Sequence, residues 1–191
     1  EKTMSQPAFD FGRNWQDFSA SKLDERRFEE ARGSLRDLLG AAALQGRSFL
    51  DIGCGWGGFA RYAAERYGCK VTAVNISQEQ LRYAQDFCEG LPVTFLDCDY
   101  RKIAGTFDKI VSVGMFEHAG AKNYRSFMHV VHNALTESGI FLLHTIGGNQ
   151  SCTSCDPWMN KYIFPNSMLP SVAQISRSVE GLFVMDDWHN L

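Results

Sequence analysis

The sequence predicts an α/β fold of the doubly wound kind, in which helices cover both faces of a mostly parallel sheet. Two observations lead to this class. Short apolar runs alternate with segments long enough to be helices, and a glycine-rich turn directly follows the first run. A chain of 191 residues that is 45% hydrophobic and 21% charged fits one domain. We expect a single domain over residues 1–191, with a lead-in over 1–45 and the core over 46–191.

The elements follow in order along the chain. The head, Glu1–Ala20, is expected to be a loop or an irregular lid, and apolar residues at helical spacing predict an amphipathic helix over Lys22–Leu39. The runs expected to form the parallel sheet are Ser48–Ile52, Val71–Ile76, Val93–Leu96, Lys109–Val113 and Ile140–Thr145. The crossover helices are expected over Gly58–Tyr67, Ser77–Cys88 and Lys122–Leu135. A sixth run, Leu182–Asp186, is expected to return to the same sheet.

The charge pattern and the cysteines exclude several classes of function. The net charge is -3 and Lys and Arg form no run, so neither a nucleic-acid surface nor a polybasic lipid anchor is expected. No apolar stretch approaches the roughly 18 residues of a membrane span, which predicts a soluble, cytoplasmic protein. Cys152 and Cys155 form a Cys-x-x-Cys pair without the second ligand pair that zinc usually needs, so no metal is expected.

The strongest chemical signal is the segment Phe49–Gly58, an apolar strand that runs into a glycine-rich turn and then a helix. Glycine allows the backbone to approach a ligand closely and to adopt positive φ values. Dinucleotide-binding loops use G-x-G-x-x-G to hold a pyrophosphate, whereas the spacing here is G-x-G-x-G after Asp51. A carboxylate suits a ligand that carries positive charge, such as S-adenosylmethionine, and would repel a phosphate.

This loop therefore has the features of the first motif of a methyltransferase. Besides Asp51, the loop residues predicted to bind the cofactor are Gly53, Cys54, Gly55 and Gly57. A glycine turn without any ligand is the alternative, but strand, acid, glycines and helix all coincide here.

Further cofactor contacts are expected where the next strands end. Asn75 closes the second strand, where nucleotide-binding folds often carry an acid for the ribose hydroxyls, and its amide can also make those hydrogen bonds. Ser77 and Gln80 have the spacing of a capping box that starts the next helix just beyond the ligand. Asp99 stands where an adenine contact is usual in this fold. With their neighbours at the same strand ends, the predicted cofactor residues are Asn75, Ile76, Gln80, Asp99, Tyr100 and Val113.

Candidate acids and bases follow the fourth and fifth strands. Glu117 and His118 come after the fourth strand, at the edge where open α/β sheets bind ligands, and the fifth strand brings His144 to the same edge. A single histidine in an apolar strand is more often a structural residue, but its expected proximity to Glu117 favours a chemical role.

Four segments carry a more specific resemblance. They are Leu50–Gly58, Val111–His118, Phe141–Gly147, and Asp156–Trp158 with Asn160–Pro165. In order and spacing they resemble the cyclopropane-fatty-acyl-phospholipid synthase family, whose members are Rossmann-like S-adenosylmethionine-dependent methyltransferases. The resemblance runs from Ser48 to Leu191, and about the first 45 residues are expected to differ from the family. The resemblance depends mainly on Asp156–Trp158 and Phe116–His118.

The resemblance implies transfer of the methyl group of S-adenosylmethionine to a cis double bond of a phospholipid acyl chain, followed by proton loss and ring closure. In the family, bicarbonate is the proton acceptor, and the residues that match Glu117, His144 and the backbone of Ile146 hold it. Trp158, Tyr162 and Phe164 would line an acyl-chain tunnel or form a packed loop. The implied partner is an unsaturated phospholipid at a membrane surface, with the protein peripheral to the inner face.

The sequence also departs from the family. The head around Phe9–Trp15 does not match the family's tyrosine-serine-cysteine segment, and neither the family's later tyrosine nor a reversed last strand is found before Leu191. The chain is therefore expected to be a fragment or to have a differently built sheet edge. Three functions remain open: the lipid synthase, a methyltransferase of a small amine or another soluble acceptor, and a domain that binds S-adenosylmethionine without turnover. The sequence does not predict the oligomeric state.

Overall fold

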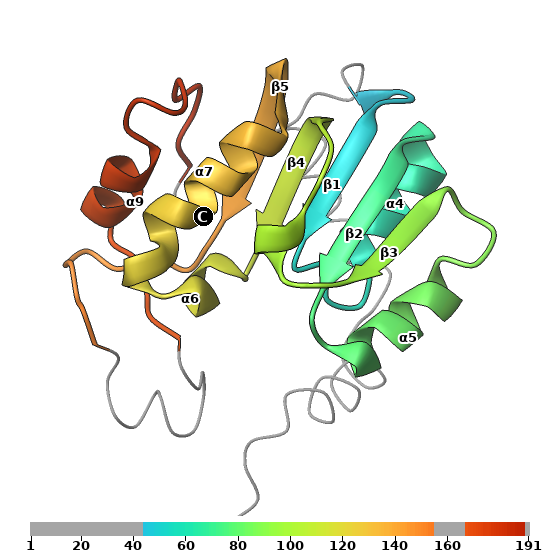
Figure 1. Cartoon of the computed structure of the whole chain (residues 1–191), viewed down its shortest axis with the longest axis horizontal. Helices are drawn as coiled ribbons and strands as arrows, with labels where there is room; N and C mark the ends of the chain where they lie inside the picture. Colours follow the sequence, from blue (N-terminus) through green and yellow to red (C-terminus); the bar gives the residue numbers. More distant parts are fainter. Residues whose placement is uncertain (1–43, 155–166, 190–191) are drawn as a thin grey trace, which may run out of the picture.

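In a computed structural model of the chain, residues 44–154 and 167–189 are described. The strands are β1 (Ser48–Ile52), β2 (Lys70–Asn75), β3 (Val93–Asp97), β4 (Phe107–Val113) and β5 (Leu135–His144). They form one sheet in the order β3-β2-β1-β4-β5, and every pairing is parallel (Figure 1). The strand order reverses direction at β1, where such folds open a crevice beyond the carboxyl ends of the strands. The predicted fold class is confirmed.

Helices cover both faces of this sheet. They are α4 (Gly58–Tyr67), α5 (Gln78–Phe87), α6 (Phe116–Ala119), α7 (Tyr124–Ala134) and α9 (Val172–Val179), with the short 3-10 turns η1 (Tyr100–Lys102) and η2 (Ala121–Asn123). The helix α4 ends at Gly68, whose positive φ and backbone hydrogen bonds close the last turn. Ser77 caps α5 by accepting a hydrogen bond from the backbone N–H of Gln80, as its spacing predicts.

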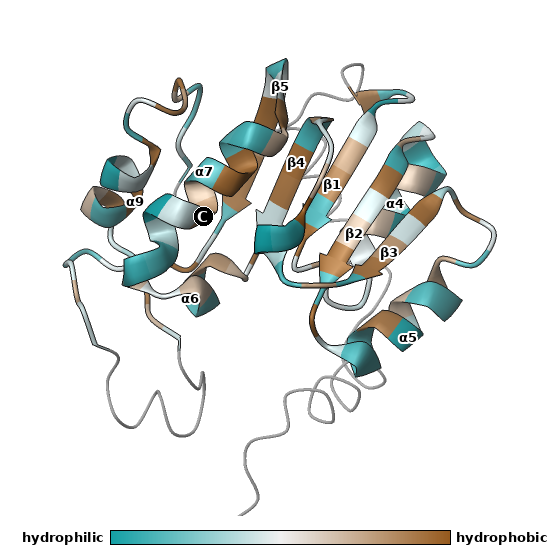
Figure 2. Cartoon of the chain, viewed as in Figure 1, coloured by the Kyte–Doolittle hydropathy of each residue, from teal (hydrophilic) through white to brown (hydrophobic). Residues whose placement is uncertain are grey.

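The core consists of two apolar clusters, one on each face of the sheet. Phe49 and Val111 pack with α4 on one face, whereas Leu50 and Ile110 pack with α7 on the other. Alternate residues of the central strands thus point into opposite clusters, which explains why these strands are continuous apolar runs in the sequence. Figure 2 shows this distribution, with hydrophobic residues on the strands and hydrophilic ones on much of the helix surface.

Most of the predicted boundaries agree with the structure. The strand β1 and the helix α4 have the predicted bounds. The helix α7 begins later than predicted because η2 precedes it, and β5 begins earlier, at Leu135. The head Glu1–Ala20 and the predicted helix Lys22–Leu39 lie outside the described residues.

The prediction of a sixth strand over Leu182–Asp186 is wrong. The backbone N–H groups of Leu182 and Phe183 donate to Val179 O in the turn that leaves α9. The side chains of these two residues pack against the cluster of α7 and β5, with the Phe183 ring 5.9 Å from that of Phe141. Val184, in contrast, is 90% exposed. The run is apolar because its first two residues, which lie in the turn after α9, pack on the core. It does not pair with β5.

The helix α9 was not predicted. It begins with a capping box, in which Ser171 accepts from the Gln174 backbone N–H and the Gln174 side chain accepts from the Ser171 N–H. This short sequence signal could have indicated it. None of the helices within 44–154 and 167–189 has the length and apolar character needed to cross a bilayer.

Candidate active site

The carboxyl ends of the parallel strands bring the predicted site residues to one edge of the sheet. Asp51 lies on β1 beside Val111 of β4, Asn75 ends β2 beside Asp97, and Val113 ends β4 beside His144. Residues from distant parts of the sequence thus meet where a doubly wound sheet binds its ligand.

Hydrogen bonds to the neighbouring strand β2 fix the conformation of the glycine-rich loop where it leaves β1. The backbone N–H groups of Gly53 and Cys54 both donate to Val74 O, at 2.8 and 3.1 Å. At Gly55 φ is +52° and a Cβ atom would meet nothing within 4 Å. A Cβ atom at Gly57 would instead lie 3.0 Å from the Cβ of Ala84 on α5. Gly55 therefore leaves room for a ligand, whereas Gly57 allows α4 and α5 to pack closely.

Asp51 is buried beneath this loop and is only 2% exposed. Its carboxylate accepts a hydrogen bond from the Ala60 backbone N–H, but Oδ2 has no partner among the described residues. Burial raises the pKa of Asp51 to about 7. A nearby positive charge would favour the ionised carboxylate, which suits a cationic ligand above this loop.

Cys54 and Cys88 also lie in this region. Both thiols are buried, and burial raises the pKa of each, to about 11 for Cys88. Such thiols remain protonated near neutral pH and are poor nucleophiles. Cys54 is therefore a buried residue of the loop and not a candidate nucleophile.

Asn75 and Gln80 form a polar network at the end of β2. Asn75 Nδ2 donates to Gln80 Oε1 at 2.8 Å, while Asn75 Oδ1 accepts from the backbone N–H of Ile76 at 2.9 Å. Ile76 itself is 73% exposed at the edge. Because local bonds use both ends of the Asn75 amide, the Nε2 group of Gln80 is the better placed donor for a ribose hydroxyl.

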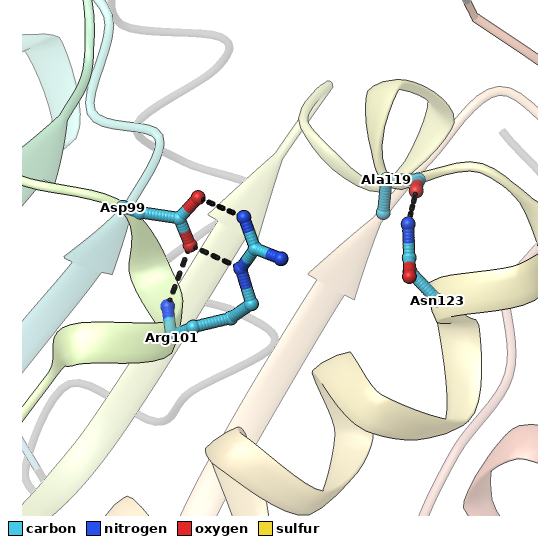
Figure 3. Close-up of polar contacts among 4 residues, drawn as sticks. All are labelled: Asp99, Arg101, Ala119 and Asn123. Carbon is cyan, nitrogen blue, oxygen red and sulfur yellow. Dashed lines mark hydrogen bonds and ion pairs between the residues drawn. The ribbon is translucent and has the colours of Figure 1, made fainter.

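Asp99 faces Arg101 after β3, as Figure 3 shows. Arg101 donates from Nε to Oδ1 at 2.8 Å and from Nη2 to Oδ2 at 2.6 Å, and its backbone N–H also donates to Oδ1. These hydrogen bonds hold the pKa of Asp99 at about 2. The carboxylate is thus ionised and fixed in orientation. Between the two residues, Tyr100 packs its ring edge-on against Phe127, 5.2 Å away.

Glu117 is the buried acid of the site, on the single turn of α6. It is 4% exposed, and its Oε1 accepts a hydrogen bond of 2.6 Å from the Ile146 backbone N–H. Its Oε2 has no partner within the described part of the chain. This hydrogen bond connects the end of β4 with the end of β5. It leaves one buried carboxylate oxygen able to accept from a ligand.

The two histidines differ from Glu117 in their exposure. His118 follows Glu117 on α6 but is exposed, and His144 ends β5 with an exposed side chain. The backbone O of His144 accepts from Gly114 N–H at 3.0 Å, which ties the two strand ends together. The ring of His144 is thus at the same edge as Glu117, where a ligand could reach it.

Some of the predicted residues lie outside the described part of the chain, and some residues that make contacts at this edge were not predicted. Trp158, Tyr162 and Phe164 lie outside the described residues, as does Cys155. Polar contacts after β3 and around α6 also involve residues that were not predicted. Arg101 donates to Asp99, Asn123 donates to Ala119 O at the end of α6, and Met168 donates to Glu117 O and accepts from Tyr124. Asn123 lies inside the helix predicted over Lys122–Leu135, so the sequence did not indicate its position directly before the observed helix α7.

Comparison with known proteins adds to this geometry. The sequence profile of the family described as mycolic acid cyclopropane synthetase matches residues 18–191. The cyclopropane-fatty-acyl-phospholipid synthase of Escherichia coli strain K12 is 58% identical over 145 residues, which are 76% of this chain and 38% of that enzyme.

Two solved structures are similar to the chain throughout most of its length. One is mycolic acid cyclopropane synthase CmaA1 in complex with SAH and CTAB, with 29% identity, a TM-score of 0.67 and coverage of 79% of this chain and 60% of that one. The other is coclaurine N-methyltransferase bound to N-methylheliamine and SAH, with 27% identity, a TM-score of 0.63 and coverage of 78% and 48%.

The match with the family profile begins at residue 18 and thus before Ser48, where the resemblance was expected to begin. The expectation that residues 1–45 differ from the family therefore applies at most to residues 1–17. The chain spans 38% of the length of the Escherichia coli synthase. From the profile match over residues 18–191 and the 58% identity to that synthase, it follows that this chain belongs to the mycolic acid cyclopropane synthetase family.

Proposed function

We propose that this protein is an S-adenosylmethionine-dependent methyltransferase that adds a methylene group across the cis double bond of an unsaturated phospholipid acyl chain. The observation that carries the proposal is Glu117, a buried carboxylate with one unpaired oxygen, at the sheet edge that also holds the glycine-rich loop. The membership of the family and the 58% identity to a cyclopropane synthase support the substrate class.

The cofactor supplies an electrophilic methyl group when it is bound. Its fit is supported by the open space at Gly55 and by the unpaired oxygen of Asp51 beneath the loop. We assign the contacts with the adenosine part to the remaining residues of the edge: Asn75, Ile76, Gln80, Asp99, Tyr100 and Val113. The structures of CmaA1 and of coclaurine N-methyltransferase both contain SAH (S-adenosylhomocysteine), the product form of this cofactor.

An alkene is a weak nucleophile, so the site must orient it, exclude water and stabilise positive charge. The carboxylate of Glu117 is suited to the last task. Because it is buried, water screens its charge little, and its orientation is already fixed by the hydrogen bond from Ile146. We assign to Glu117 the stabilisation of the charge that develops on the acyl chain.

Ring closure also requires a base, and bicarbonate would supply it in this site. Glu117 Oε2 can accept a hydrogen bond from the hydroxyl group of the ion, and the ring of His144 can donate one to its charged oxygens. The N–H of Ile146 already donates to Glu117 Oε1. We therefore assign to Ile146 the orientation of Glu117, and direct contact with the ion to Glu117 and His144.

The test uses the purified protein with methyl-labelled S-adenosylmethionine, bicarbonate and vesicles of cis-unsaturated phospholipid. Label should enter the extracted lipid, and the fatty acids should gain the mass of one methylene group. Vesicles of saturated phospholipid are the control, since they present the same surface without a double bond. Equal label in both lipids, or no label in either, would contradict the proposal.

A second candidate is methylation of a small amine, and the similarity to coclaurine N-methyltransferase favours it. In this case Glu117 or His144 would orient the amine or accept its proton. Label would then appear in soluble amines and remain absent from the lipid. A protein that binds the cofactor and labels neither acceptor would be a binding domain without turnover.

A further inference from the structure

The position of Glu117 depends on contacts from outside its own helix. The helix α6 has only four residues, and a single turn does not form by itself because helix nucleation is unfavourable. Its N-cap, Met115, contributes no side-chain hydrogen bond. Other elements must therefore hold α6 in place if the Glu117 carboxylate is to stay at the sheet edge.

Two adjacent residues at the start of α7 make such contacts. Asn123 is the N-cap of α7, yet its side chain does not cap that helix. Instead its Nδ2 donates to Ala119 O at the end of α6, at 2.7 Å (Figure 3). Next to it, the ring of Tyr124 stacks on Phe116 at the start of α6, with 4.2 Å between centroids and 22° between planes. Both ends of α6 are thus attached to α7.

The hydroxyl group of Tyr124 adds a third attachment. It donates to Met168 O at 3.0 Å, and the N–H of Met168 donates to the backbone O of Glu117 at 2.8 Å. Both Tyr124 and Met168 are buried. Burial, together with the nearby charge of Glu117, raises the pKa of Tyr124 to about 12, so the hydroxyl remains a donor at neutral pH. Without it, Met168 O would be a buried acceptor with no partner among the residues that the structure describes.

We propose that Asn123 and Tyr124 are positioning residues for Glu117, which hold α6 so that the Glu117 carboxylate stays on the backbone N–H of Ile146. They touch neither the cofactor nor the reacting atoms in this scheme. Their effect on turnover rests on the proposed function, but their effect on the hydrogen bond between Glu117 and Ile146 does not. The two effects can therefore be measured separately.

The first test is Tyr124→Phe, which keeps the stacked ring and removes the hydroxyl. In a protein labelled with 15N-isoleucine, the amide proton of Ile146 should resonate far downfield, because its hydrogen bond to a carboxylate is short and charge-assisted. The variant Ile146→Leu identifies this signal, and Glu117→Gln shows its position without the charge. We expect Tyr124→Phe to shift the signal upfield, towards its position in Glu117→Gln.

The matched control is Tyr67→Phe, which removes another buried tyrosine hydroxyl on the opposite face of the sheet. It should leave the Ile146 signal in place. In the lipid assay, Tyr124→Phe should lower kcat about tenfold, the kinetic equivalent of one lost hydrogen bond, with an unchanged KM for S-adenosylmethionine. A purely structural loss would lower the amount of folded protein and leave the Ile146 signal of that folded protein unchanged.

An unshifted Ile146 signal in folded Tyr124→Phe would overturn the proposal, whatever the activity. If the parent protein made no cyclopropane product, the proposed function would fail, while the spectrum would still decide the positioning role. Should Tyr124→Phe not fold, Asn123→Asp replaces it, because this change removes the donor to Ala119 O at an exposed position. An upfield shift in that variant supports the proposal, and an unshifted signal overturns it.

Discussion

Gly55 and Gly57 lie two positions apart in the same loop and differ in what surrounds them. Both have positive φ, but a Cβ atom would meet open space at Gly55 and the helix α5 at Gly57. The sequence pattern indicated that both are required, without distinguishing ligand contact from packing. The distinction depends on Ala84, which comes next to the loop only when α5 packs against α4.

We predict that Gly55→Val abolishes the binding of S-adenosylhomocysteine, because the side chain would fill the space that the ligand needs. Isothermal calorimetry measures this directly. Gly46→Val is the matched control, since Gly46 also has positive φ and no atom within 4 Å of its Cβ position, but precedes the amino end of β1. Both variants should lose similar stability from backbone strain. Unchanged affinity in Gly55→Val would remove the loop from the cofactor site.

Glu117→Gln tests the acid of the site. The amide keeps the size of the side chain and can still accept from Ile146, but it removes the negative charge. Turnover should fall by about 10²-fold or more, in the range of a lost general acid–base or charge-stabilising group, with nearly unchanged affinity for S-adenosylhomocysteine. Steady-state kinetics and calorimetry give the two quantities. A variant as active as the parent would exclude Glu117 from the mechanism.

The contacts around Glu117 show why the sequence revealed only part of the site. Glu117 and His144 were predicted because parallel strands bring their carboxyl ends to one edge, and the structure places both residues there. Tyr124 and Met168 are 44 positions apart in the chain, and no local pattern relates them. Their pairing arises only when the segment after residue 166 packs back against α7.

Among the elements, the predicted bounds were accurate where the apolar periodicity ends at a turn residue such as glycine. The strand β1 ends at a glycine turn, and α4 ends at Gly68, so both have clear limits in the sequence. The prediction of a strand over Leu182–Asp186 was wrong because an apolar run has the same composition in a strand and in an irregular segment that covers a core. The helix α9 was overlooked because it is short, although its capping box was visible.

We predict that Ser171→Ala lowers the free energy of unfolding by about 1 kcal/mol, the usual cost of a lost N-cap. Ser171 caps α9, and its hydroxyl group also pairs with that of Ser151 at 2.7 Å. Ser176→Ala, at an exposed position within α9, is the control and should leave stability equal or slightly higher. Urea unfolding measures both. Equal midpoints for the two variants would show that the cap does not stabilise the fold.

For the whole molecule, the two ends of the strands differ in how their polar side chains are paired. At the amino edge, Ser48 and Asp108 join β1 and β4 through hydrogen bonds of Ser48 N–H and Oγ to the Asp108 carboxylate. At the carboxyl edge, two buried carboxylates, Asp51 and Glu117, each keep an oxygen without a partner among the described residues. Unpaired buried acids reduce stability, so we infer that they are retained for ligand binding.

This arrangement makes the stability of the ligand-free protein depend on pH through Asp51. Its pKa is raised from 3.8 to about 7 in the folded state, so the folded protein holds the proton more tightly than the unfolded chain. The contribution of Asp51 to stability is therefore fully present below about pH 4 and is lost as the pH rises to about 7. One pKa unit corresponds to about 1.4 kcal/mol, so the free energy of unfolding falls through Asp51 by at most about 4 kcal/mol over this pH range.

Asp51→Asn should remove this dependence, because the amide stays neutral at every pH and can still accept from Ala60. We expect the variant and the parent to have similar free energies of unfolding at pH 4, and the variant to become relatively more stable as the pH rises to 8. Urea unfolding at several pH values measures the difference, in which contributions from other titrating groups cancel. If the difference between the two proteins were the same at pH 4 and pH 8, Asp51 would be ionised in the folded protein throughout, and the unpaired oxygen would have a partner.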